Sequence, residues 1–204
     1  MSLEFMITAL IVVLIPGTGV LYTLAIGLGK GRRASIAAAV GCTFGILPSV
    51  IASVLGLSAL LHTSALVFQA LKIAGVAYLL YLAWQTLQSA GPLNLKPDTD
   101  DGKSWLGIAV TAALINVLNP KLTVFFMAFL PQFVSPSTPS PVIAMLTMGA
   151  VFMAMTFAVF VVYGQFAGLV GQRLLKSERA MAWMRRSVAA TFAAFGVRLA
   201  LAER

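Results

Sequence analysis

The sequence predicts an all-α membrane protein: six transmembrane helices arranged as two inverted three-helix repeats, with broken first and fourth helices. This fold class is predicted by three observations: the apolar composition, the number of long apolar runs and a matched pair of helix breaks. Of 204 residues, 60% are hydrophobic and only 10% are charged, and the mean hydropathy is +0.96. A soluble domain carries roughly 25% charged residues, because its surface faces water. Most of this chain's surface is therefore expected to contact the lipid bilayer.

Six apolar runs are the candidate membrane spans. A helix needs about 20 apolar residues to cross the hydrocarbon core. The first run is expected to be a retained span, because Glu4 stands where a signal peptide is positive and no A-x-A-like cleavage site follows. The runs are Leu3–Ala25, Ser35–Leu61, Leu66–Leu87, Leu106–Leu130, Pro141–Val162 and the shorter Val188–Leu201.

Basic residues between the runs predict the orientation. The first, third and fifth connections hold ten Lys and Arg residues, whereas the second and fourth hold none. The positive-inside rule then makes the odd connections cytoplasmic and places both termini outside the cytoplasm. The net charge of +8 reflects this topology and no nucleic-acid partner is expected, because a duplex binder needs a water-exposed basic face. The ten residues are Lys30, Arg32, Arg33, Lys96, Lys103, Arg173, Lys176, Arg179, Arg185 and Arg186.

A polar stretch divides the chain into halves. Residues 1–88 form the first predicted three-helix repeat, residues 89–105 a cytoplasmic linker, and residues 106–204 the second repeat. Three spans per half turn the second half upside down relative to the first. Many secondary transporters use this inverted-repeat arrangement.

Corresponding helices of the two halves carry breaks at similar depth. Pro16-Gly17-Thr18 lies about thirteen residues into the first run, and Asn119-Pro120-Lys121 about fourteen residues into the fourth. Proline lacks an amide hydrogen and clashes with the preceding turn, so each site should kink or unwind its helix. Paired breaks in two halves point to a transport site. The alternative is that these prolines only bend their helices.

Lys121 is an ionisable residue well away from either end of its apolar run. Such a residue is costly in a membrane and marks a functional site by default. Beside Asn119 and a broken helix it is suited to hold an anionic group, such as a substrate carboxylate. The alternative is that it reaches a loop carbonyl or the headgroups by snorkelling. The predicted substrate-binding residues are Pro16, Gly17, Thr18, Asn119, Pro120 and Lys121.

Several classes of function lack their residues here. All six acidic residues lie at termini, span edges or predicted cytoplasmic loops, so no carboxylate serves a cation site in mid-membrane. Cys42 and His62 are too few ligands for a metal, and neither a metal nor a cofactor is expected. No GxSxG, HExxH or GxxxxGK[ST] motif indicates an enzyme. Gly41 and Gly45 instead predict close helix packing, within the chain or, alternatively, in a homo-oligomer.

The motifs in their order resemble the bacterial amino-acid exporter superfamily named for its lysine exporter (LysE/RhtB-type). The resemblance rests on a Pro-Gly break in the first span, a basic Gly-rich first loop and Asn119-Pro120-Lys121 in the fourth span. The stretches Leu71–Leu82 and Phe125–Phe133 are also similar to the family's. One departure is Thr18, where the family usually has a second proline in Pro-Gly-Pro.

This resemblance implies a function, a substrate class and a location. It implies a transporter of the bacterial inner (plasma) membrane that exports a small amino acid or derivative, driven by the proton-motive force. Thr18 puts the identity of the substrate in doubt more than transport itself. The competing hypotheses are an exporter of another cargo, such as a metal cation, and a non-transporting membrane scaffold subunit.

Overall fold

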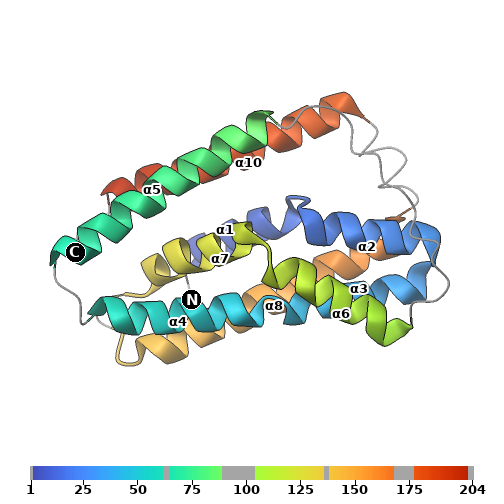
Figure 1. Cartoon of the computed structure of the whole chain (residues 1–204), viewed down its shortest axis with the longest axis horizontal. Helices are drawn as coiled ribbons and strands as arrows, with labels where there is room; N and C mark the ends of the chain where they lie inside the picture. The colour runs from blue at the N-terminus through green and yellow to red at the C-terminus, as the bar shows by residue number, and fades with distance from the viewer. Residues whose placement is uncertain (1, 62–64, 89–103, 136–137, 168–176, 202–204) are drawn as a thin grey trace. The chain divides into compact units, whose positions relative to one another are not determined.

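The structure is a computed structural model that describes residues 2–61, 65–88, 104–135, 138–167 and 177–201. Within these ranges the chain forms helices and turns and contains no strand, which confirms the predicted all-α class (Figure 1). The α-helices are α1 (Leu3–Leu14), α2 (Thr18–Gly29), α3 (Arg32–Phe44), α4 (Leu47–Leu61), α5 (Ala65–Gln88), α6 (Trp105–Val117), α7 (Pro120–Phe129), α8 (Pro141–Gln165) and α10 (Glu178–Leu201). A short 3₁₀ helix, η1 (Leu130–Phe133), follows α7.

The helix ends follow local sequence signals. Ser2 caps α1 by accepting the Phe5 amide at 3.2 Å, and Ser104 caps α6 by accepting the Gly107 amide at 3.1 Å. A serine in this position satisfies one of the amides that a helix start leaves unbonded. Gly31 connects α2 to α3 with a φ of 86°, a conformation that favours glycine.

Part of the membrane prediction is tested by helix length and composition. Among the described residues, the runs Arg32–Gly56 and Pro141–Gln165 are long and apolar enough to cross a membrane. A third span results if α1 and α2, which bend by 51° at their break, count as one. Two or three candidate spans are therefore established by this criterion, and α6 is a shorter apolar helix.

The predicted run Ser35–Leu61 contains the candidate span Arg32–Gly56, in which a turn at Gly45 and Ile46 separates α3 from α4. One sequence expectation needs correction. The last helix was expected to begin at Val188, but α10 begins at Glu178 and has 24 residues. Arg179, Arg185 and Arg186 therefore lie on this helix and not in a connection, because a helix can continue from a polar stretch into an apolar one.

The chain forms two compact units, each described by itself. Unit 1 comprises Met1–Pro48, Gly91–Asn119 and Gly149–Met181, and unit 2 comprises Ser49–Ala90, Pro120–Met148 and Ala182–Arg204. Unit 1 thus holds α1, α2, α3, α6 and most of α8. Unit 2 holds all of α5 and α7 and most of α4 and α10.

Unit 1 is built on close helix contacts, with α3 running alongside α6 and packed against α2 (Figure 1). Gly41 faces the backbone of Ala109, and Gly45 faces the backbone of Ala113. The two contacts advance together along both helices, so α3 and α6 run in the same direction. The predicted approach of another helix to this glycine pair is confirmed, and its partner lies within the same chain.

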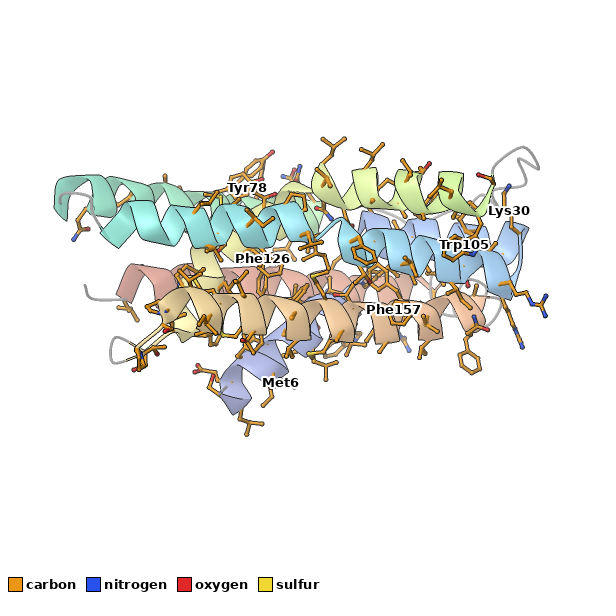
Figure 2. All side chains as sticks on the ribbon, turned by 90° about the horizontal axis from the view of Figure 1, so that it is seen from below. Met6, Lys30, Tyr78, Trp105, Phe126 and Phe157 are labelled. Atoms are coloured by element: carbon orange, nitrogen blue, oxygen red, sulfur yellow. The ribbon has the colours of Figure 1, made fainter. Side chains whose placement is uncertain are left out.

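A second pair of helices in unit 1, α2 and α8, also packs closely. Gly19 on α2 lies near Phe160 on α8, and Gly27 lies near Gly164, so α2 and α8 also run in the same direction. The Gln165 side chain donates to the carbonyl of Arg32 at 3.1 Å, which brings the end of α8 to the start of α3. Lys30 and Trp105 lie at this same end of unit 1 (Figure 2).

Candidate functional site

The first helix break lies between α1 and α2. In a continuous helix the carbonyl of Leu14 would accept the amide of Thr18, but the chain is extended at Ile15 and Gly17 and α2 begins anew at Thr18. The Tyr163 hydroxyl on α8 donates to this carbonyl at 2.7 Å. The break predicted at Pro16-Gly17 is confirmed, and a side chain from a distant helix satisfies the group it frees, as a non-aqueous environment requires.

The second break separates α6 from α7. Helix α6 ends at Val117, three residues before Pro120, which begins α7 and has no amide hydrogen. The Asn119 amide donates to the carbonyl of Asn116 at 3.1 Å, closing a tight last turn. The break predicted at Asn119-Pro120 is therefore also confirmed.

Two of the predicted site residues meet although 101 positions separate them. The Asn119 side-chain amide donates to the Thr18 hydroxyl at 3.3 Å within unit 1. Thr18 is exposed and Asn119 is half-buried, so the pair is accessible from outside the protein. Pro16 and Gly17, both half-buried, immediately precede Thr18. The structure thus joins the first break to the end of α6.

The other two predicted residues follow along the chain. Pro120 and Lys121 form the first turn of α7, and their side chains lie outside the described residues. The role expected for the Lys121 ammonium group therefore remains a prediction from sequence.

A buried cluster beside this pair was missed by the sequence reasoning. We call it the Asn116 clamp, and it consists of Asn116, Cys42 and Gly19. The Asn116 side-chain amide donates to the carbonyl of Cys42 at 2.7 Å, and the Cys42 thiol lies 3.7 Å from the carbonyl oxygen of Gly19. The available signal was the side-chain amide of Asn116, a costly group inside an apolar run and one helical turn before Asn119.

The start of α2 adds electrostatic character to the exposed pair. Its N-cap is Gly17, which has no side chain to bond the first amides of the helix. Amides at a helix start carry a partial positive charge and favour an anion. The Thr18 hydroxyl and this helix start can therefore donate hydrogen bonds to a carboxylate. Among the described residues, no group of three or more His, Cys, Asp or Glu side chains could hold a metal ion.

The chain is similar to known proteins over most of its length. The model of the family described as LysE type translocator matches residues 10–203. An uncharacterized membrane protein of Vibrio cholerae is 31% identical over 98% of this chain and 97% of its own length. No solved structure matches the chain.

Two similar proteins have names that state what they transport. A homoserine/homoserine lactone efflux protein of Salmonella typhimurium is 32% identical over 66% of this chain and 65% of its own length. A leucine efflux protein of Enterobacter sp. is 25% identical over 96% of this chain and 93% of its own length.

Proposed function

The chain belongs to the LysE type translocator family, and on that premise we propose that it is a secondary active transporter exporting a small amino acid or amino-acid derivative. The relatives named for homoserine, homoserine lactone and leucine efflux support this substrate class. Family members are transporters, so the chain is a membrane translocator and not an enzyme. The observation that carries the proposal is the hydrogen bond between Thr18 and Asn119, which joins two helix breaks.

The proposed site uses these breaks to bind the substrate carboxylate. Thr18 and the start of α2 supply hydrogen-bond donors, and Lys121, two residues after Asn119, supplies the positive charge. Pro16, Gly17 and Pro120 are proposed to hold the backbone open at the two breaks. A small zwitterionic substrate presents a carboxylate that fits these donors.

The proposed topology has six spans arranged as two inverted repeats, residues 1–88 and 106–204, joined by residues 89–105. Alternating crossings require the first and fifth spans to run in one direction and the second and fourth in the other. Two pairings in unit 1 support this pattern: α2 runs parallel to α8, and α3 runs parallel to α6. Lys30, Arg32 and the start of α6 at one end support odd connections on one side, proposed to be the cytoplasm.

Export in cells tests the substrate class. A bacterial strain that overproduces the protein should accumulate one or a few amino acids in its medium relative to a vector control. Lys121→Ala should abolish this export, whereas Lys72→Ala, a matched change nearer the end of a predicted span, should preserve it. A well-folded Lys121→Ala variant that exports at the wild-type rate would remove the lysine from the mechanism. A medium with no excess amino acid, despite abundant membrane protein, would refute amino-acid export.

The energy source requires a separate measurement. We propose that the proton-motive force of the inner membrane drives export. Vesicles containing the purified protein should accumulate the substrate when a proton gradient is imposed, and a protonophore should abolish that accumulation. Accumulation that persists with a protonophore present would require another coupling ion.

A further inference from the structure

The Asn116 clamp connects three helices at the level of the exposed Thr18–Asn119 pair. Asn116 is 3% exposed and lies on α6, Cys42 is fully buried on α3, and Gly19 is buried on α2. A side-chain amide in an apolar interior costs free energy unless its polar atoms are hydrogen-bonded. An apolar residue would fill this position without that cost, so the amide has something specific to hold.

The group it holds is made available by the turn between α3 and α4. In a continuous helix the Ile46 amide would donate to the carbonyl of Cys42. Here that amide donates to the carbonyl of Thr43 instead, at 3.2 Å. The Cys42 carbonyl is therefore released from the helix, and the Asn116 amide occupies it at 2.7 Å.

The side-chain oxygen of Asn116 limits how closely α2 can approach α6. A methyl group added at Gly19 would lie 2.7 Å from the Asn116 oxygen and 3.1 Å from the Cys42 sulfur. The Cys42 thiol also lies 3.8 Å from the carbonyl oxygen of Ala112 on α6. Backbone and side-chain atoms of α2, α3 and α6 are thus in contact around one buried amide.

Each member of the exposed pair is attached to this clamp through the backbone. Thr18 immediately precedes Gly19, and the Asn119 amide donates to the carbonyl of Asn116. We infer that Asn116 is a positioning residue of the transport site: by holding the Cys42 carbonyl and limiting the approach of Gly19, it keeps Thr18 and Asn119 within hydrogen-bonding distance. The inference deepens the proposed function and rests on it for the identification of this pair as the substrate site.

A crosslinking experiment on the full chain tests the geometry without any substrate. Thr18→Cys and Asn119→Cys are introduced together with Cys42→Ser, which removes the only native thiol and keeps the Cys42 backbone carbonyl. A short bifunctional thiosulfonate then joins the two cysteines. Peptide mass mapping of the purified protein measures the rate of this crosslinking. Asn116→Ala is added to remove the clamp, and Asn116→Leu removes the amide while keeping most of the volume.

The matched control removes another buried polar group from unit 1. Thr156 on α8 is 3% exposed, and its hydroxyl donates to the Phe152 carbonyl of its own helix at 2.9 Å. Thr156→Val therefore loses a hydrogen bond that joins no two helices. The crosslinking rate should fall about tenfold in both Asn116 variants, as expected when a buried hydrogen bond that fixes a geometry is lost, and should be unchanged in Thr156→Val. Equal rates in the Asn116 and Thr156 variants would overturn the inference.

Transport measurements separate this inference from the proposed function. In vesicles, the Asn116 variants of the otherwise native chain should raise the KM for the exported amino acid about tenfold and leave the maximal rate within about twofold. An unchanged KM in folded Asn116 variants would show that the clamp only stabilises the fold. If the wild-type protein moves no amino acid, the proposed function fails, while the crosslinking rates still decide whether Asn116 positions Thr18 and Asn119.

Discussion

The two units of this protein pack their helices differently. In unit 1, glycines place one helix backbone directly against another, as at Gly41 with Ala109 and Gly45 with Ala113. In unit 2, Gly56 and Gly196 meet side chains instead: the Cβ position of Gly56 lies 3.9 Å from the end of Met127, and that of Gly196 lies 3.5 Å from Leu80. Helix contacts through small residues depend on backbone fit, whereas contacts through long side chains can readjust.

Both units bury large side chains, and in unit 2 aromatic residues of α7 are prominent among them. Phe125 and Phe126 are buried on α7 in an edge-to-face arrangement, with ring centroids 5.4 Å apart (Phe126 is labelled in Figure 2). Leu79 and Leu130 are buried in the same unit. The pair Thr18 and Asn119 belongs to unit 1, so the candidate substrate contacts lie where a small displacement of one backbone is least tolerated.

The largest expected effect compares two glycines. Gly41→Ala places a methyl group within clash distance of the Ala109 carbonyl, and both helices must separate to accept it. Overpacking of this kind should lower the free energy of unfolding by about 3 kcal/mol. Among the described residues, Gly56→Ala meets nothing closer than 3.9 Å, and it should be neutral or slightly stabilising because alanine favours helix more than glycine. The stability of both variants is measured by thermal unfolding in detergent and by the fraction of monodisperse protein. Equal melting temperatures of the two variants would contradict the difference between the units.

The next effect concerns Gly19 and its neighbour in the clamp. Gly19→Ala should destabilise unit 1 by about 1–3 kcal/mol, because the new methyl group meets the Asn116 oxygen, the Cys42 sulfur and the Phe160 ring. In an Asn116→Ala background the same change should cost less, since one of the three opposing groups is gone. A double-mutant cycle on melting temperature measures this coupling. Strict additivity of the two changes would show that Gly19 and Asn116 do not limit each other.

A smaller effect distinguishes a carbonyl at a helix break from a carbonyl inside a helix. Tyr163→Phe removes the hydroxyl that donates to Leu14 at the first break, and should cost about 1 kcal/mol. Ser53→Ala in unit 2 removes a hydroxyl that donates to the Phe126 carbonyl, and should cost about 0.6 kcal/mol, the average for hydrogen bonds between membrane helices. Chemical unfolding of the two variants side by side shows which one loses more free energy of unfolding. A larger loss for Ser53→Ala would reverse it.

Sequence alone predicted the local features of this site but not the contacts that hold it. Both breaks were predictable because proline acts within its own turn, at Pro16 and at Pro120. The bond from Asn116 to Cys42 was not, because it joins residues 74 positions apart and depends on how α3 and α6 meet. The turn after α3 was missed because hydropathy stays high across it. The early start of α10 was missed because Arg185 and Arg186 interrupt the apolar run without interrupting the helix.

The smallest expected effect lies in unit 2, where the hydroxyls of Ser49 on α4 and Thr123 on α7 are 3.3 Å apart. Two neutral hydroxyls at that distance share one weak hydrogen bond, so Ser49→Ala should cost at most about 0.6 kcal/mol. The double variant with Thr123→Val should cost no more than the sum of the single changes, and the KM for the exported amino acid should be unchanged. Unfolding and vesicle transport are measured on the same preparations.

This pair is the counterpart in unit 2 of the Asn116 clamp, because each is a polar contact between two helices. They differ in what they hold. The Asn116 amide occupies a carbonyl released by a helix turn, whereas the two hydroxyls of unit 2 bond only each other among the contacts of the described residues. If Ser49→Ala raised the KM as strongly as Asn116→Ala, then polar contacts in both units would govern substrate binding, and backbone fit in unit 1 would not be what distinguishes the site.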